Sequence, residues 1–456
     1  MSNEGHHRRL LARAPLGFGV MSNIAGLAKL AYGMKFIRDV GILQLGKAVA
    51  LVVGFVGSVV FARILGPENY GLYAIVAAFA GIVSSFINFG VWSTTVNLIS
   101  KAIGRQDREE VRNIIIYFLK VTLLVTNVLW LLVVIFAPQL VTLVYGDVSL
   151  ANFLRLNVLV NISAVSFLLL SLTYQVFRNI TKLIFLETTK KILAVSVSII
   201  FVAAGFGVAG IFYGLLITEL IFLIVSIVLL SRIANSFPLF PSFEEVVKNF
   251  WQVRISKYLK FSLQIAADKN LNNFVVDAPT FMLGILSTPE QAGLFKVAHS
   301  IGTLPKIFSS NISRLLATVF PLKDSQDPGS LKIYYKKVAK WGTMLTFGMV
   351  AAVFIGTLLF FRLLYGQEYL PALPALYIVL GTNLLLGYAV SFSPVIRTMK
   401  KMAASIGLNV LALILTILIG LIAIPKFGAL GAAFSMFGWF FVSIILIFKI
   451  ESWLKS

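Results

Sequence analysis

Long apolar runs separated by short polar turns extend along almost the whole chain. Each run has about twenty residues with few charges, enough for a helix to cross the roughly 30 Å hydrocarbon core of a bilayer. We therefore predict an all-α integral membrane protein with about twelve transmembrane helices. The predicted spans are roughly 40–63, 71–99, 112–137, 152–176, 184–205, 209–231, 256–284, 293–319, 333–360, 371–396, 402–424 and 428–450.

The polar stretches between the spans divide the chain. A basic arm precedes the first span, and we expect an amphipathic part of it to lie along the membrane surface. A longer linker follows the sixth span, where Ser242 and Glu245 have the spacing of a capping box for a short surface helix. The predicted parts are the arm (1–38), an N-lobe (39–231), the linker (232–255), a C-lobe (256–450) and a short tail (451–456).

Three turn sequences occur twice at nearly constant spacing. They are ILGPENYGLY and ILSTPEQAGLF, beginning at Ile64 and Ile285; LVYG and LLYG, ending at Gly146 and Gly366; and FGVAG and FGALG, beginning at Phe206 and Phe427. The offset is 222 residues from Pro67 to Pro289, and 220 and 221 residues for the other two pairs. Pro/Gly turns recur between helices, which explains one such match, but the constant spacing favours an internal duplication.

The duplication predicts two six-helix lobes. Because each lobe has an even number of spans, both enter the membrane from the same side and are related by a pseudo-two-fold axis along the membrane normal. In transporters built from such repeats, the substrate path lies between them near the bilayer midplane. The pattern therefore indicates a transporter that rocks its lobes.

Composition and charge agree with this class. Charged residues make up 12% of the 456 residues, about half the share typical of soluble chains. The excess of 39 Lys and Arg over 18 Asp and Glu is explained better by basic cytoplasmic loops than by nucleic acid. Predicted inner segments carry most basic residues, including Lys190 and Lys191, whereas outer loops carry only Arg63, Arg362 and Lys426. We predict a multi-pass protein of a bacterial inner or archaeal plasma membrane, with both termini cytoplasmic and no nucleic-acid partner.

The sequence offers little for catalysis or cofactor binding. It has no Cys and three His, which excludes thiolate metal sites and leaves too few scattered His residues for another. GILQLGKA, from Gly41 to Ala48, approaches a phosphate-binding loop, but Ala48 replaces the hydroxyl that would hold Mg²⁺, and the stretch opens a membrane helix. We expect no enzyme activity, no ATP site and no cofactor, with transport driven by H⁺, Na⁺ or the membrane potential.

Basic residues also fall within or near the predicted spans. They are Lys47, Lys120, Lys269, Lys296, Lys306 and Arg314. A cation at the centre of a spanning helix costs roughly 2.5–3.5 kcal/mol, so six facing lipid would cost on the order of 15–20 kcal/mol. That exceeds a typical stability of about 5–15 kcal/mol. Some can extend to the interface, and we expect the others to line a wet cavity.

The eighth span places its basic residues on one side. At 100° per residue, Lys296, His299, Lys306 and Arg314 fall within an arc of about 80°, although Pro305 is expected to bend the helix. One interpretation is a cationic stripe facing the cavity; in the other, Lys296 and Arg314 extend to opposite interfaces and His299 makes a structural hydrogen bond. On the first interpretation, the substrate-binding cations are Lys47, Lys269, Lys296, His299, Lys306 and Arg314.

Carboxylates in the spans are candidates for ion coupling. In the seventh span, Asp277 shares a face with Lys269, and Asp268 lies on another face. These carboxylates can bind substrate, carry a coupling H⁺ or Na⁺, or pair with the lysine. Glu219 is alone in the sixth span, where a helix-packing hydrogen bond or an ion site would explain it. The candidate coupling residues are Asp268, Asp277 and Glu219.

Fixed cations favour an anionic passenger, because charge-assisted contacts to phosphate are strong in a low-dielectric site. Apolar surroundings that reach lipid favour a passenger with a hydrocarbon tail.

The stretch from Gly46 to Val91 resembles the polysaccharide (Wzx-type) flippases of the multidrug/oligosaccharidyl-lipid/polysaccharide (MOP) exporter superfamily. A first span runs into ARILG at residues 62–66, then YGLY at 70–73 and a second span ending near Gly90. The resemblance continues through the YG and FG-x-x-G turns over about 40–450, without the two extra helices of MurJ-type flippases. It implies two lobes around a central cavity and alternating access. The implied partners are a polyprenyl-(pyro)phosphate-linked oligosaccharide carried from the inner to the outer leaflet, membrane lipids, and glycosyltransferases or a polymerase of the same pathway.

Two other functions stay open. A drug/cation antiporter of the same superfamily would favour a cavity of carboxylates and aromatics, which the cation excess argues against. A membrane polysaccharide polymerase or ligase would present a large outer loop with catalytic groups, whereas every predicted outer loop is short.

Overall fold

The computed structural model describes residues 17–177, 179–306, 313, 316, 320, 330–399 and 401–454. All regular structure in these residues is helical, which confirms the all-α class. The first half contains α1 (Gly17–Ile87), α2 (Val91–Gly104), α3 (Arg108–Lys120), η1 (Val121–Thr126), α4 (Asn127–Ile135), α5 (Ala137–Tyr145), α6 (Leu150–Ser163), α7 (Val165–Val176), α8 (Ile180–Phe201), η2 (Val202–Phe206) and α9 (Gly207–Ser236). After α10 (Phe243–Asn249) in the linker, the second half contains α11 (Ser256–Leu286), α12 (Pro289–Gly302), α14 (Ser330–Tyr365), η3 (Leu370–Ala372), α15 (Leu373–Thr382), η4 (Asn383–Leu385), α16 (Leu386–Thr398), α17 (Met402–Phe427), α18 (Ala429–Ser435) and α19 (Phe437–Trp453).

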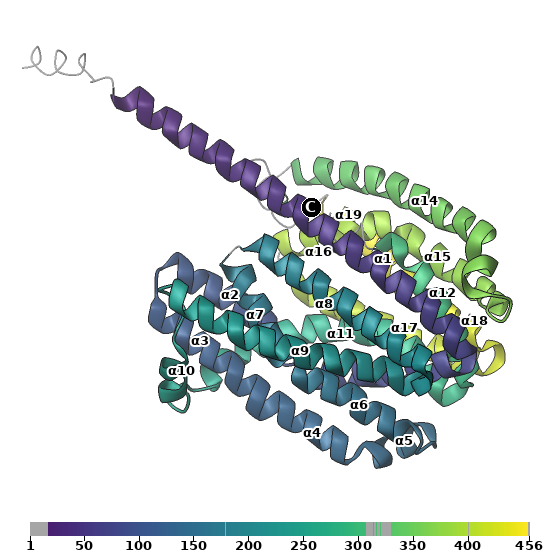
Figure 1. Cartoon of the computed structure of the whole chain (residues 1–456). Helices are drawn as coiled ribbons and strands as arrows, with labels where there is room; N and C mark the ends of the chain where they lie inside the picture. The colour runs from purple at the N-terminus through teal and green to yellow at the C-terminus, as the bar shows by residue number, and fades with distance from the viewer. Residues whose placement is uncertain are drawn as a thin grey trace, which may run out of the picture.

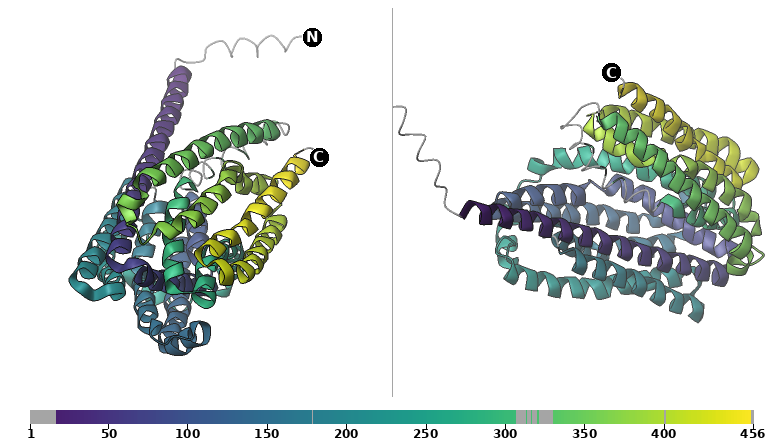
Figure 2. Two further views of the ribbon diagram at one scale, coloured as in Figure 1. Left: turned by 90° about the vertical axis from the view of Figure 1, so that its right-hand side faces the viewer. Right: turned by 90° about the horizontal axis from the view of Figure 1, so that it is seen from above.

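The helices pack side by side in one elongated bundle (Figure 1). Figure 2 shows the first half, coloured purple to teal, beside the second half, coloured green to yellow. As far as the described residues reach, each of the twelve predicted spans coincides with a helix or with consecutive helices. Seven stretches are long and apolar enough to cross a membrane on their own, or eight if Leu370–Leu385 and Gly387–Ile396 form one bent span. The number of crossings, twelve, stays a prediction.

α1 consists of two antiparallel helices joined at Gly66. Its apolar stretch Gln44–Ile87 has 44 residues, about twice the length of one crossing. The Ser58 and Tyr70 hydroxyls are 3.0 Å apart, whereas this much straight helix would separate them by about 18 Å. Gly66 reverses the chain with φ 72° and ψ 173°, a backbone conformation that side chains with a Cβ rarely adopt. Before the first span, α1 is already helical from Gly17, so part of the basic arm extends this helix.

Two of the three duplicated turns have similar backbone geometry in both halves. Gly207 has φ 56° and ψ −138°, and its sequence match Gly428 has φ 54° and ψ −123°. Gly146 and Gly366, which end the matched YG turns, have φ values of 70° and 86°. Positive φ favours glycine, so glycine recurs at these positions for the same reason in both halves. At these two turns the halves therefore repeat in backbone conformation as well as in sequence.

The two copies of the first turn pack against each other. Gly71 in the second part of α1 and Gly293 in α12 cross backbone to backbone. A Cβ on Gly71 would be 1.7 Å from the Pro289 carbonyl oxygen, and a Cβ on Gly293 would be 1.9 Å from the Pro67 carbonyl oxygen. Such a reciprocal contact is what a two-fold axis between similar halves produces. The motif thus occurs twice because both copies form one crossing; we name this end of the bundle the hinge end.

Polar contacts join the halves around this crossing. The Arg63 guanidinium donates to the Leu364 carbonyl at 2.7 Å and also to the Leu363 carbonyl. The Tyr369 hydroxyl donates to the Ala62 carbonyl at 3.1 Å. All three hydrogen bonds connect residues about three hundred positions apart in sequence, so they hold the hinge end closed in this structure.

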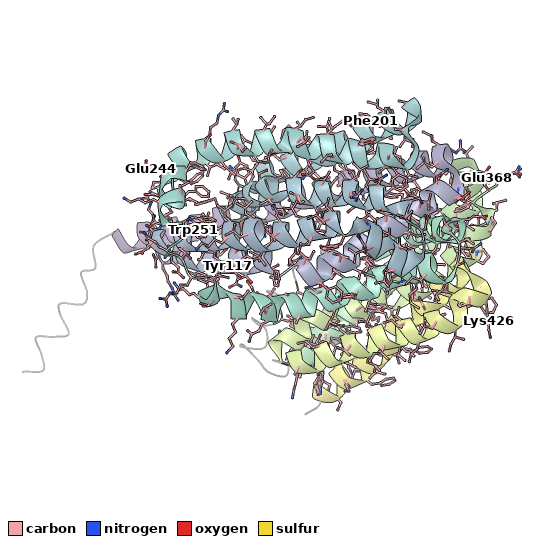
Figure 3. All side chains as sticks on the ribbon, turned by 90° about the horizontal axis from the view of Figure 1, so that it is seen from below. Tyr117, Phe201, Glu244, Trp251, Glu368 and Lys426 are labelled. Atoms are coloured by element: carbon pink, nitrogen blue, oxygen red, sulfur yellow. The ribbon has the colours of Figure 1, made fainter. Side chains whose placement is uncertain are left out.

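The hydrophobic cores show where the halves separate. At the hinge end, one cluster of buried residues draws on both halves of the chain. Away from it, one cluster belongs to the first half with Tyr258 added, and another belongs to the second half alone. Figure 3 labels Phe201, Glu368 and Lys426 at the hinge end and Glu244 at the opposite end, which we name the linker end. The halves therefore share a core at the hinge end, whereas toward the linker end only α11 among the described helices of the second half stays packed against the first half, through contacts such as the Lys257–Glu110 ion pair and the Tyr117–Ser262 hydrogen bond.

The linker end is organised around α10. Its predicted capping box is confirmed: the Ser242 hydroxyl accepts from the Glu245 amide at 3.2 Å, and the Glu245 carboxylate accepts from the Ser242 amide at 3.1 Å. Arg108 forms an ion pair with Glu245 at 3.0 Å. Lys120, one of the cations predicted near a span, donates to the Val253 carbonyl at 2.9 Å. Its charge is thus satisfied at the linker and does not require a cavity.

Candidate functional site

Charged side chains from several helices converge in the interior between the halves. The Lys296 ammonium of α12 lies 5.9 Å from the centre of the Tyr73 ring, within the range of a cation–π contact. Asp277 on α11 and Lys191 on α8 are close enough to interact electrostatically with Lys296, and Lys306 does the same with His299. We name the following residues the central charged cluster: Lys191, Asp277, Lys296, His299 and Lys306.

Asp277 extends from α11 toward the first half of the chain. A Cβ on Gly81 of α1 would be 2.4 Å from the Asp277 Oδ2 atom, so the carboxylate occupies space that only a glycine leaves. Four ion pairs occur among the described residues, and none includes Asp277, Lys296 or Lys306. These charges are near one another without direct pairing, which leaves donor and acceptor positions for a ligand or an ion.

A break in α12 precedes Lys306. The helix ends at Gly302, three residues before Pro305, whose lack of an N–H predicts a bend in this region. The Asn383 amide donates to the Gly302 carbonyl at 2.6 Å, and Asn383 itself lies at the break between α15 and α16. Two interrupted helices therefore stabilise each other here. Lys306 follows the break and is exposed, as a ligand-binding cation requires.

Lys190 and Lys191 were counted with the basic residues of the inner segments, but the structure places them inside a long helix. Both lie in the middle of α8. Lys191 faces α1, because a Cβ on Gly54 would be 3.7 Å from its Cε atom. Lys47, which is half-buried, precedes Gly54 by two helical turns and lies on the same face of α1. Lys191 was not among the predicted site residues, although the polar stretch ETTKK interrupts the fifth predicted span.

The sequence suggested that Glu219 is the one charge in its span, but in the structure it has a charged partner from another span. Lys190 Nζ lies 2.8 Å from Glu219 Oε2, with the two side chains 16% and 12% exposed. The same ammonium is 4.0 Å from the centre of the Phe167 ring. The two charges come from different spans, so their pairing depends on how α8 packs against α9. This geometry supports the packing interpretation of Glu219, and a coupling role for it is still only a prediction.

Replacing Lys190 with alanine is expected to lower thermal stability. In soluble proteins, removing one partner of a buried ion pair costs about 3–5 kcal/mol, because the remaining charge is left unpaired. A thermal melt of the purified protein should show a lower midpoint for Lys190→Ala, largely restored when Glu219→Gln is added. Lys426→Ala, at the hinge end, is the control; an unchanged Lys190→Ala midpoint would contradict a stabilising pair.

Other predicted site residues are not placed with the cluster. Arg314 lies outside the described residues. The side chains of Asp268 and Lys269 are not described either, although their backbone lies in α11 about two turns before Asp277. In the part of the chain that the structure describes, no group of three or more His, Asp or Glu side chains is placed to hold a metal ion.

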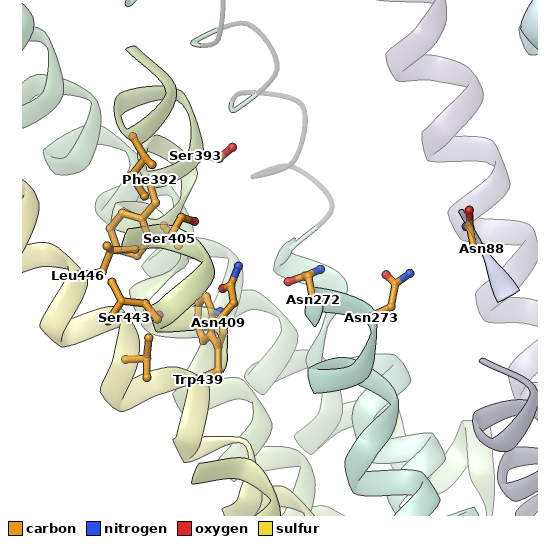
Figure 4. Close-up of a pocket in the computed structure, with 14 residues that line it drawn as sticks. Asn88, Asn272, Asn273, Phe392, Ser393, Ser405, Asn409, Trp439, Ser443 and Leu446 are labelled. Carbon is orange, nitrogen blue, oxygen red and sulfur yellow. The ribbon is translucent and has the colours of Figure 1, made fainter. Parts of the chain in front are cut away.

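A cavity of about 660 Å³ opens beside α11, close to the charged cluster. α11, α16, α17 and α19 contribute most of its wall, and Asn88 lies on the opposite side (Figure 4). Asn273 lines the cavity on α11 one helical turn before Asp277. The described lining residues are uncharged, so the cavity and the charged cluster are neighbouring sites of different chemistry.

Residues 60–374 match the model of a family described as polysaccharide biosynthesis protein. The match covers more than half of this multi-pass membrane protein, which therefore belongs to that family. The chain is 23% identical over 386 residues to the probable low-salt glycan biosynthesis flippase Agl15 of Haloferax volcanii, covering 83% of this chain and 75% of that protein. It is 29% identical over 132 residues to stage V sporulation protein B of Bacillus subtilis, covering 29% of this chain and 26% of that relative.

Solved structures of MOP transporters share the fold. The lipid II flippase MurJ in an inward closed conformation matches with a TM-score of 0.68 and 15% identity, covering 91% of this chain and 88% of that one. A multidrug resistance MATE transporter in an inward-facing conformation matches with a TM-score of 0.67 and 14% identity, covering 89% and 94%. These likenesses confirm the predicted two-lobed MOP fold, and they do not by themselves distinguish a flippase from a drug transporter.

Proposed function

We propose that the chain is a flippase that carries a polyprenyl-(pyro)phosphate-linked oligosaccharide from the inner to the outer leaflet for surface polysaccharide or glycan biosynthesis. The observation that carries the proposal is the grouping of Lys191, Lys296 and Lys306 between the halves, with Lys296 half-buried and the other two exposed. Ammonium groups in a low-dielectric site bind phosphate oxygens strongly. Membership of a polysaccharide biosynthesis family and similarity to a probable glycan flippase support the same passenger.

In this proposal the two halves alternate between states. The closed hinge end, together with a linker end where α11 alone among the described helices bridges the halves, corresponds to a state that accepts the phosphate head from the linker end, while the prenyl tail stays in the bilayer. Rocking of the halves would then part the Gly71–Gly293 crossing and release the head on the other side. Asp277, beside Lys296, is our proposed coupling group for H⁺ or Na⁺, with Asp268 the second candidate on α11.

A drug/cation antiporter is the second candidate, because MATE transporters share the fold. The described charged cluster contains three lysines and one carboxylate, and such a site disfavours a cationic drug. A membrane polymerase or ligase has less support, since the similar solved structures are transporters.

Translocation of a fluorescent polyprenyl-diphosphate-linked oligosaccharide in proteoliposomes tests the proposal. We expect the purified protein to make the inner-leaflet lipid accessible to a membrane-impermeant quencher, and Asp277→Asn to remove the dependence on an imposed H⁺ or Na⁺ gradient. Translocation of an organic cation in place of the lipid would favour the antiporter.

The linker end is proposed to face the cytoplasm, together with both termini. The natural chain has no Cys, so a single introduced thiol is labelled without background. Glu244→Cys at the linker end should react with an impermeant maleimide only in inverted vesicles or broken cells, and Lys426→Cys at the hinge end should react in intact cells. The opposite labelling pattern would reverse the topology.

A further inference from the structure

The cavity beside α11 contains hydrogen-bonding groups that the protein does not use. Asn272 and Asn273 of α11 and Asn409 of α17 line it, and their side chains point into the same space (Figure 4). None of the three amides forms a hydrogen bond with another residue in the described ranges. Each amide carries two donors and a carbonyl oxygen that accepts twice. A ligand rich in hydroxyl or acetamido groups would satisfy them.

An aromatic surface faces these amides. Trp439 of α19 and Phe392 of α16 line the same cavity, with Trp439 half-buried and Phe392 7% exposed. Sites for small organic ligands combine aromatic walls with a few placed polar groups. An aromatic face can pack against the C–H face of a sugar ring while amides bind its hydroxyls, whereas a purely apolar tail would leave the amides unsatisfied.

The charge and the volume of the cavity further restrict the kind of ligand that it can bind. The described lining residues include no Lys, Arg, Asp or Glu, so the cavity does not select a charged group as the neighbouring cluster does. Its volume of about 660 Å³ lies within the roughly 300–1,000 Å³ of sites that bury a drug-sized ligand. A short run of uncharged sugar rings fits both limits.

The cavity lies beside the charged cluster in the same way that the first sugar of a lipid-linked oligosaccharide lies beside its phosphate. Asn273 precedes Asp277 by four residues, about 6 Å of helical rise, and Asp277 interacts with Lys296. In a lipid-linked oligosaccharide, the first sugar is bonded directly to the phosphate. A phosphate held by Lys296 would therefore place the first sugars within reach of the amides on α11.

We infer that the cavity lined by Asn272, Asn273, Asn409 and Trp439 is a glycan-binding subsite that holds the first uncharged sugars of the passenger. The inference rests on the proposed function and adds to it the part of the protein that recognises the glycan. The charged cluster then binds any polyprenyl phosphate, and the cavity distinguishes a glycosylated lipid from a bare one.

Binding of two defined probes to the full chain in nanodiscs tests this subsite. The probes are a ten-carbon prenyl diphosphate, bare or bearing the uncharged disaccharide of N-acetylglucosamine. We expect wild type to bind the disaccharide probe about ten-fold more tightly, and Asn272→Leu/Asn273→Leu to remove this preference while the bare probe binds as before. Asn161→Leu, an exposed asparagine of α6, is the matched control, and Lys296→Ala should weaken both probes equally.

The other possible binding results show whether the glycan subsite alone or the proposed flippase function is rejected. If wild type binds both probes equally, the glycan subsite is rejected and the phosphate-binding function stands. If wild type binds neither probe, the proposed function is rejected and the subsite with it. If the double variant is not monodisperse, Asn409→Leu and Trp439→Leu replace it, and a retained preference in both rejects the subsite.

Discussion

Lys296→Ala is expected to slow translocation of a lipid-linked oligosaccharide at least ten-fold while the protein remains inserted in the membrane. Lys296 lies in the interior on α12, beside Asp277 and Lys191, without a direct ion pair among the described residues. A hydrogen bond to a charged group contributes about 1.5–3 kcal/mol, which corresponds to roughly 10- to 150-fold in affinity. The initial rate in proteoliposomes containing equal amounts of protein measures the effect.

Three further variants separate charge from structure. Lys296→Arg keeps the charge and should retain more activity than Lys296→Ala. Lys426→Ala removes a lysine at the hinge end, outside the cluster, and should leave the rate unchanged. Lys191→Ala should behave like Lys296→Ala, because the structure places Lys191 near the same ammonium. A wild-type rate for Lys296→Ala would remove Lys296 from the phosphate site.

Features that depend on local sequence were predictable. The apolar runs fixed the positions of the helices because each crossing needs about twenty apolar residues. The capping box at Ser242 and Glu245 and the break near Pro305 follow from the backbone groups those residues supply or lack. The duplicated turns could be recognised in the sequence because the same unusual backbone conformation occurs in both halves. That conformation favours glycine, which therefore recurs at Gly207 and Gly428.

Features that depend on which helix faces meet were not predictable. Helical periodicity places Glu219 and Lys190 on their own helices, but only the packing of α8 on α9 shows that they pair. Lys191 was counted with the basic residues of the inner segments because the positive-inside rule counts charges on each side of the membrane and does not give the depth of a side chain. The cavity beside α11 is built by four helices far apart in sequence, and no local pattern connects Asn273 with Asn409 or Trp439.

The reciprocal glycine contact at the hinge end has a direct consequence for transport. Gly71→Ala would place a Cβ 1.7 Å from the Pro289 carbonyl oxygen, far below the 3.0 Å that real Cβ contacts respect. Since the obstacle is backbone, the two helices must separate by more than 1 Å. Forcing extra atoms into a well-packed contact costs about 1–3 kcal/mol, or roughly 5- to 150-fold in the population of the closed hinge end. Spin labels on Glu68→Cys and Glu290→Cys, both exposed, should show longer distances in Gly71→Ala.

The translocation rate should fall with the closed population, because alternating access requires each end to close in turn. Gly293→Ala should have the same effect, since its Cβ would meet the Pro67 carbonyl oxygen at 1.9 Å. Gly348→Ala in α14 is the matched control, because a Cβ there meets nothing within 4 Å. If Gly71→Ala and Gly293→Ala leave both the distances and the rate unchanged, the crossing does not close the hinge end. If distances lengthen while the rate holds, closure of this end does not limit the transport cycle.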